Sequence, residues 1–172
     1  MSVLKGKKIL FFVHELYEDL ELWYPKLRLI EEGAEVVVSA PEMKEYQGKH
    51  GYRCMPDTTV DKVETSEYDG LVIPGGFAPD KLRRYQRVLE IVREFDQANK
   101  MVAFICHAGW VPISAKILKG RRATSVSAIK DDMTNAGVQY SDEAVVIDGN
   151  LISSRHVNDL PDFGLAIVKY FS

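Results

Sequence analysis

The sequence has few cysteines, no excess of basic residues and no long hydrophobic run. Only Cys54 and Cys106 occur in 172 residues, so no disulfide framework is implied. The net charge of -3 lacks the positive excess that favours phosphate binding, and we expect no nucleic-acid partner. The apolar run at 9–13 is shorter than a secretory core. Because the composition is also average, at 46% hydrophobic residues, we expect a cytoplasmic protein with no membrane contact.

The segments that are present alternate between strands and helices. Apolar runs at 9–13, 34–40, 71–73 and 101–105 predict strands, and the first of them is nearly continuously apolar, as in a parallel sheet covered on both faces. Apolar residues at helical spacing follow several of these runs. This alternation predicts an α/β sandwich with a mostly parallel sheet. No linker or repeat interrupts the chain, so we expect one domain over residues 1–172.

Other segments have weaker patterns. Residues 44–63 have no helical period and contain two glycines, which predicts short strands or a hairpin that projects from the sheet. The remaining predicted elements are a helix at 79–99, a short helix at 129–136, strands at 144–147 and 151–154, and a terminal helix at 160–171.

The pair Cys106-His107 is the most informative feature. It ends an apolar run, and a small-residue turn follows it before a helical segment, which predicts a strand, a sharp turn and a helix with the thiol at the corner. The amino end of the helix would favour a thiolate at that position. We interpret Cys106 as a nucleophile, and a buried structural cysteine is the alternative.

Two other strand ends carry polar or glycine residues. Glu18 follows the first strand, and Gly75-Gly76 follows the third. Because the carboxyl ends of parallel strands share one edge of a sheet, these loops should lie near Cys106. The glycine amides, with the N–H of His107, would then form an oxyanion site. The simpler alternative for Glu18 is a favourable negative charge at the start of a helix. The simpler alternative for the two glycines is a tight turn.

The sequence offers no metal motif. His14, His50, His107 and His156 have no ligand spacing, and the cysteines give no zinc pattern. We therefore expect no metal and no cofactor. Arg155 could hold a substrate carboxylate or a structural one, and the structural role is the expected one.

The chain resembles the ThiJ/PfpI superfamily, in particular its PfpI-type intracellular cysteine protease and deglycase group, over almost its whole length. The matching segments are Glu18-Asp19-Leu20-Glu21-Leu22, Gly48-Lys49-His50-Gly51-Tyr52, Pro74-Gly75-Gly76, Ile105-Cys106-His107, Ile129-Lys130-Asp131-Asp132-Met133 and Ser153-Ser154-Arg155. The resemblance implies a flavodoxin-like three-layer sandwich, like that of class I glutamine amidotransferases. It also implies a homodimer or a hexamer.

The resemblance assigns roles to four residues. Cys106 would be the nucleophile, Glu18 the carboxyl hydrogen-bonded to its sulfur, and His107 the general base. Asp80 matches an acidic residue that a neighbouring subunit donates to the triad. The alternative for Asp80 is a helix-start residue.

The chain departs from the group at three positions. Asp80 is one methylene shorter than the usual glutamate, Trp110 follows the Cys-His pair at close range, and Val126 stands where some relatives have a tyrosine. Trp110 would be a pocket wall or a packing residue, and Val126 supplies no hydroxyl.

Together these features predict a cysteine-nucleophile hydrolase acting on a peptide or a small carbonyl compound. The first expectation is an intracellular protease or amidase of the PfpI type. One alternative is a deglycase or glyoxalase acting on methylglyoxal or its adducts. Another is a redox-sensing or chaperone protein whose Cys106 is oxidised.

Overall fold

A seven-stranded sheet forms the centre of the computed structural model, which describes residues 2–172. The strand order is β10-β11-β7-β6-β1-β2-β5, and every neighbouring pair is parallel except β10 and β11. In chain order the elements are β1 (Lys8–Phe12), α1 (Asp19–Glu31), β2 (Glu35–Ala40), β3 (Tyr46–Gln47), β4 (Arg53–Cys54), β5 (Thr58–Thr59), β6 (Gly70–Ile73), α2 (Ala78–Leu82), α3 (Gln86–Gln97), β7 (Met101–Ile105), α4 (Trp110–Ala115), β8 (Arg122–Ala123), α5 (Lys130–Asn135), β9 (Gln139–Tyr140), β10 (Val145–Asp148), β11 (Leu151–Ser154) and α6 (Leu160–Tyr170).

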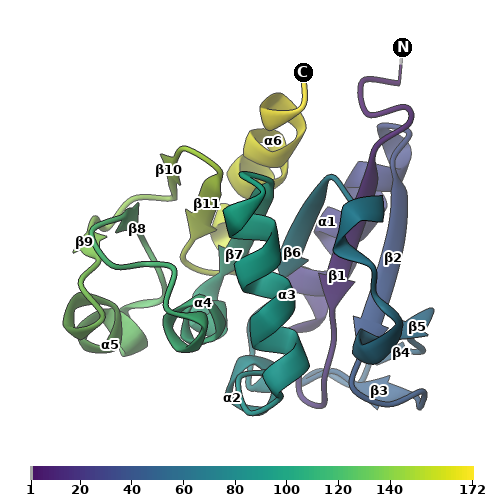
Figure 1. The fold of residues 1–172 in the computed structure, drawn as a ribbon, viewed down its shortest axis with the longest axis horizontal. Coiled ribbons are helices and arrows are strands. Elements are labelled where there is room, and N and C mark those ends of the chain that lie inside the picture. Colours follow the sequence, from purple (N-terminus) through teal and green to yellow (C-terminus); the bar gives the residue numbers. More distant parts are fainter. Residues whose placement is uncertain (1) are drawn as a thin grey trace.

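Helices cover both faces of the sheet. α1 and α6 pack against each other and against β2 and β11, whereas α3 packs against β6, β7 and α4. Figure 1 shows α3 in front of the sheet and α1 behind it. Because both faces are covered, every residue of β6 and β7 is buried, which explains their unbroken apolar sequences. The predicted three-layer α/β sandwich with a mostly parallel sheet is confirmed.

Two predicted segments differ in detail. The continuous helix expected at 79–99 is wrong, since the chain forms α2 and α3 as separate helices and Tyr85 is extended before α3. The segment 44–63 does contain a hairpin, formed by β3 and β4, but β5 then pairs in parallel with β2 at the sheet edge. Within residues 2–172 no helix is long and apolar enough to cross a membrane.

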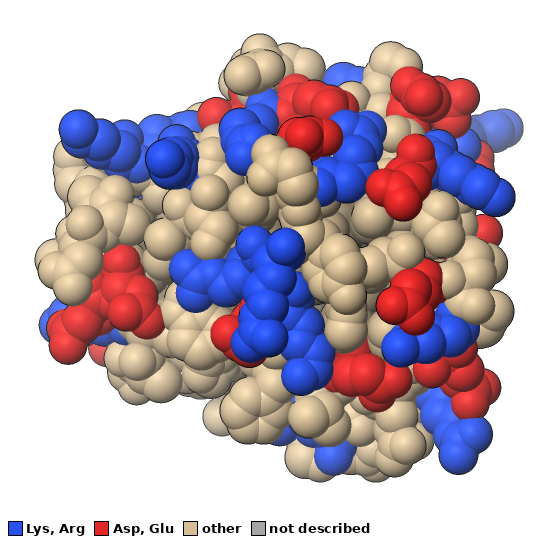
Figure 2. Space-filling model, turned by 60° about the horizontal axis from the view of Figure 1, so that its bottom comes forward, with Lys and Arg blue, Asp and Glu red and all other residues tan. Residues whose placement is uncertain are grey.

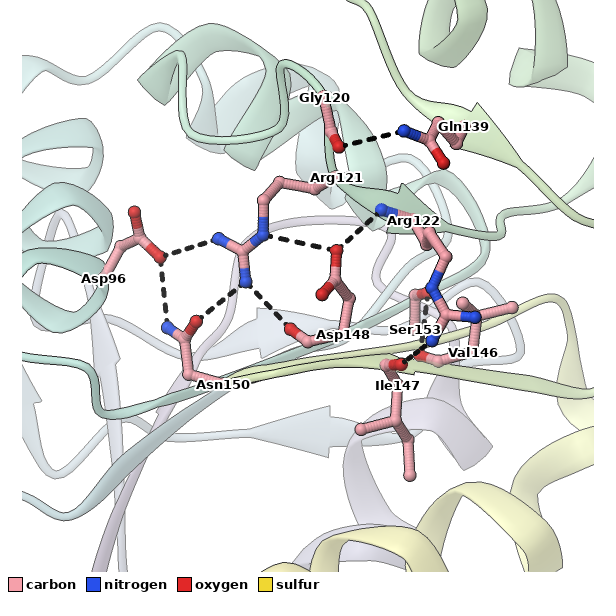
Figure 3. A network of polar contacts seen from close by, with 10 residues as sticks. All are labelled: Asp96, Gly120, Arg121, Arg122, Gln139, Val146, Ile147, Asp148, Asn150 and Ser153. Atoms are coloured by element: carbon pink, nitrogen blue, oxygen red, sulfur yellow. Dashed lines mark hydrogen bonds and ion pairs between the residues drawn. The ribbon is translucent and has the colours of Figure 1, made fainter.

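Arg121 connects three parts of the molecule (Figure 3). Its guanidinium lies 3.4 Å from an Asp96 oxygen on α3, donates to the Asp148 carbonyl at 2.8 Å, and donates to Asn150 Oδ1 at 2.9 Å. The side chain is only 25% exposed, so water does not replace these partners well. Arg121 therefore fastens the β8–β9 region to α3 and to the end of the sheet.

We expect an Arg121→Ala variant to lose about 2–4 kcal/mol of unfolding free energy, because it leaves partly buried acceptors without a donor. Urea denaturation followed by circular dichroism measures this loss. Arg53→Ala is the control, since Arg53 pairs with Glu45 on the surface and should cost less than about 1 kcal/mol. Equal losses in the two variants would contradict the role of Arg121.

Candidate active site

Cys106 lies at a sharp turn between β7 and α4. It begins a 3-10 turn over Cys106–Gly109, directly after the last residue of β7. Its φ of 64° is in the left-handed region, which a residue with a Cβ adopts only when its surroundings enforce it. The predicted strand, turn and helix are confirmed. The half-buried thiol is thus held at the carboxyl edge of the sheet, where β1 also ends (Figure 1).

The sulfur of Cys106 has polar groups on several sides. The Nδ1 atom of His107 lies 3.3 Å from Sγ. The backbone N–H groups of His107 and Gly76 lower the pKa of the thiol, and the Glu21 carboxyl lies beside it, since a Cβ at Gly75 would contact both Glu21 Oε2 and Cys106 Cβ. The site therefore combines a thiol, an imidazole, a carboxyl group and two amide donors.

The carboxyl group at the thiol belongs to Glu21, and the expectation that Glu18 would occupy this position is wrong. Glu18 precedes α1 with an extended backbone, and its Oε2 lies 3.4 Å from both Lys49 Nζ and His50 Nε2. Glu21, one turn into the helix, is 1% exposed and accepts the Gly75 N–H at 2.8 Å. The sequence motif contains both acids, and only the start of α1 decides which one faces inward.

Burial controls the protonation of this pair. Burial and, to a smaller extent, the nearby charge of Glu18 raise the pKa of Glu21 to about 8, although the Gly75 N–H bond acts in the opposite direction. Burial and the Glu21 charge raise the pKa of the Cys106 thiol, whereas the His107 and Gly76 amides lower it. When Glu21 carries a proton its charge disappears, so the thiolate is stabilised in the state in which Glu21 is neutral.

His107 has the properties of a base at neutral pH. Its imidazole is half-buried, and burial together with the charge of Lys49 lowers its pKa. A neutral imidazole can accept a proton. Lys49, which the sequence alone did not identify as a site residue, thus acts on the site through its charge.

The Gly75-Gly76 turn requires the absence of side chains. A Cβ at Gly75 would lie 2.4 Å from Glu21 Oε2 and 2.7 Å from Cys106 Cβ, and Gly76 has a φ of 80°. Gly76 and His107 direct their amides at the sulfur, whereas the Gly75 amide is occupied by Glu21. Of the three residues expected to hold an oxyanion, Gly75 therefore has no free donor.

Asp80 does not join the site within one chain. Its carboxylate pairs with Arg84 on the surface, four residues further along the chain. That Asp80 completes the triad at His107 of a second subunit stays a prediction. Arg155 has a structural environment, since it bonds Asp159 and Asp142.

One group of side chains near the site has the composition of a metal site. Ligand atoms of Glu18, Asp19 and His50 lie within 4.8 Å of one another. However, the Asp19 oxygens accept the N–H groups of His50 and Tyr52, each at 2.8 Å, and Lys49 lies beside Glu18. The Asp19 oxygens are thus already occupied, and the positive charge of Lys49 would repel a metal cation. The group is therefore a structural link between α1 and the 48–52 loop.

Comparison with known proteins shows the family of this chain. Residues 7–170 match the DJ-1/PfpI family. The chain is 49% identical to "Deglycase PfpI" of Pyrococcus furiosus over 89% of this chain and 92% of that protein. It is 39% identical to "Putative cysteine protease YraA" of Bacillus subtilis over 92% and 94%.

A solved structure gives the same result for the fold. A two-domain protein of Anabaena variabilis, with DJ-1/ThiJ/PfpI-like and ferritin-like domains, superposes with a TM-score of 0.95 at 42% identity. The match covers 96% of this chain and 48% of that one, about half of its length. The resemblance inferred from the sequence motifs is confirmed. The shared sequence, the matching fold and the extent of both matches show that the chain belongs to the DJ-1/PfpI family.

Proposed function

We propose that the protein is a cysteine-dependent hydrolase that converts 2-oxoaldehydes such as methylglyoxal, either free or as their adducts with amines and thiols, to hydroxyacids. Two kinds of observation support this proposal. The chain is 49% and 48% identical to archaeal proteins named "Deglycase PfpI" and "Deglycase PH1704". The site also contains two separate groups, Glu21 and His107, that can exchange protons beside one thiol.

The proposed reaction begins when the Cys106 thiolate forms a hemithioacetal with the substrate. The thiolate adds to the aldehyde carbon of a free 2-oxoaldehyde, or it replaces the amine or thiol of an adduct at that carbon, and the amine or thiol leaves with a proton. A base removes the proton from this carbon, and a proton is returned to the neighbouring carbon, so that the hemithioacetal becomes a hydroxyacyl thioester. The amides of Gly76 and His107, which lower the pKa of the thiol, would stabilise the oxyanions of these steps. Water then hydrolyses the thioester and regenerates the free Cys106 thiol. When methylglyoxal is the substrate, the released product is lactate.

The single observation that carries this proposal is the protonatable carboxyl of Glu21 at the sulfur. Peptide hydrolysis needs one base that later protonates the leaving amine, and His107 would be enough for that. The 2-oxoaldehyde reaction also moves a proton between adjacent carbons. A group with a pKa of about 8 can both give and accept a proton near neutral pH, which suits this transfer.

The test compares products from two substrate classes. We expect the purified protein to form lactate from methylglyoxal in an enzymatic lactate assay, and to leave a panel of fluorogenic peptides uncleaved. The Cys54→Ser variant should retain the parent rate, because the Cys54 thiol is buried on β4 and contacts the Met55 carbonyl. Peptide cleavage without lactate formation would overturn the proposal.

A peptidase is the second candidate, and the similarity to YraA favours it. The Cys106 and His107 pair also has the composition of a cysteine peptidase site. The same assay distinguishes the two candidates. A peptidase would cleave the fluorogenic peptides at a rate that follows the fraction of Cys106 present as thiolate, and it would form no lactate.

A further inference from the structure

A groove beside His107 has no part in the chemistry described above. It lies between α2, α4 and α5. Its lining residues are Arg83, Trp110, Ile113, Asp132, Asn135 and Ala136. Four of these side chains carry polar groups, which a purely structural crevice does not require.

One aromatic ring separates this groove from the nucleophile. The ring of Trp110 has its centre 5.2 Å from the His107 ring, and the His107 Nδ1 atom is 3.3 Å from the sulfur. The indole Nε1 donates to Asp132 at 2.8 Å, so the ring is fixed in this orientation. A substrate that is held at Cys106 and passes the His107 ring would meet the Trp110 ring next.

Arg83 presents its guanidinium over the same ring. Its Cζ lies 5.6 Å from the Trp110 centre, and its Nε donates to Ser114 Oγ at 2.8 Å. Within residues 2–172 no carboxylate pairs with Arg83, whereas the neighbouring Arg84 is paired with Asp80. A guanidinium that is stacked, fixed at Nε and free at its outer edge is arranged to receive a carboxylate in two parallel hydrogen bonds.

The surroundings also favour a single negative charge. Lys81, Arg83 and Arg84 follow one another in and directly after α2, although the whole chain carries a net charge of -3. Figure 2 shows basic side chains gathered in the middle of the face that includes the lower edge of the sheet. Asp132 on the other side of the groove opposes a dianionic group such as a phosphate, which leaves a carboxylate as the better fit.

We propose that Arg83 recognises a carboxylate on the part of the substrate that leaves, so that the protein prefers adducts of carboxylate-bearing amino compounds and thiols over neutral ones. The preference rests on the proposed function, because it concerns the substrate of that reaction. Arg83 acts in binding and does not touch the reacting atoms.

The experiment uses two substrates that differ only in charge. The hemithioacetals of methylglyoxal with N-acetylcysteine and with N-acetylcysteine amide have the same reacting group, and only the first has a carboxylate. We expect the parent to show a kcat/KM about 10-fold higher for the carboxylate, the factor given by one partly exposed charged hydrogen-bond pair. Arg83→Gln should remove this preference through KM and leave the amide substrate unchanged.

Two further variants serve as controls. Arg84→Gln removes the same charge from the same region, but its guanidinium is already paired, so the preference should remain. Asp132→Asn keeps an acceptor for the indole and removes the opposing charge, so the preference should increase by about 2- to 5-fold. A parent without preference, or an Arg83→Gln variant that loses both substrates equally, would overturn the proposal.

A second readout works without turnover. S-acetonyl-N-acetylcysteine is an unreactive analogue of the adduct, and it should protect Cys106 from iodoacetamide at a lower concentration than its amide does. Arg83→Gln should remove this difference. If the parent turns over neither adduct but the protection differs, the proposed function fails and the carboxylate site stands. If turnover occurs and neither rate nor protection depends on the carboxylate, only the carboxylate site fails.

Discussion

A Cys106→Ser variant is expected to lose at least about 1,000-fold in the rate of lactate formation from methylglyoxal. The serine hydroxyl ionises far less readily than a thiol, and the amides that face the sulfur cannot make up the difference. His107 and Glu21 would remain in place, so the loss would report on the nucleophile alone. Lactate formed under single-turnover conditions is the measurement.

The second cysteine provides a matched control for this variant. Cys54 is 2% exposed, whereas Cys106 is partly exposed and has His107 Nδ1 3.3 Å from its sulfur. Cys54→Ser should therefore keep the parent activity, and iodoacetamide should modify Cys106 but leave Cys54 unmodified. A Cys106→Ser variant with more than a tenth of the parent rate would show that another group attacks the substrate.

Replacing Glu21 with glutamine should reduce kcat by about 100- to 1,000-fold, the usual contribution of one acid-base group. Glutamine keeps the size of the side chain and can still accept the Gly75 N–H, but it cannot release and accept a proton at the thiol. Because the charge of Glu21 raises the pKa of Cys106, its removal should leave alkylation of the thiol at pH 7 as fast as in the parent or faster. Turnover should thus fall while the alkylation rate does not.

The comparison of the two rates identifies what Glu21 does. If alkylation by iodoacetamide falls as much as turnover does, Glu21 serves to ionise the thiol and does not transfer protons. Glu18→Gln is the matched control, because Glu18 carries the same group three residues earlier but faces Lys49 and His50. We expect it to lose less than about 10-fold in kcat, since it reaches the thiol only through its charge.

Stability measurements at two pH values test the burial of Glu21 separately. Burial raises its pKa from 4.5 to about 8, so the unfolded chain releases a proton in this range that the folded protein still holds. The contribution of Glu21 to the stability of the parent is therefore fully present below pH 4.5 and is lost as the pH rises through 8. Glu21→Gln should match the parent near pH 4 and exceed it at pH 9 by roughly 2–4 kcal/mol in urea denaturation.

The strand and the turn at the nucleophile could be predicted from the sequence because both depend on local patterns. The apolar run at 101–105 is too regular for a loop, and Cys106 follows it directly. The motifs around Cys106 and the glycine pair also indicated the family. The order and spacing of those motifs are properties of the chain itself.

The tertiary structure decided which acid meets the thiol. Glu18 and Glu21 are both in the motif after β1, and Leu20, Leu22 and Leu27 are at helical spacing beside them. The spacing predicts a helix but not its rotation about its own axis. In the folded protein Leu20 and Leu27 are 56% and 57% exposed, whereas Glu21 is buried against the Gly75 turn.

What the sequence by itself determined is therefore the set of elements, the position of the thiol at the end of β7, and the loops that meet there. Only the tertiary structure decided that Glu21 faces the sulfur, that Asp80 pairs with Arg84, and that Arg83 lies over Trp110. The physical reason is that secondary structure follows from neighbouring residues, whereas the direction of a side chain depends on packing between segments far apart in the chain.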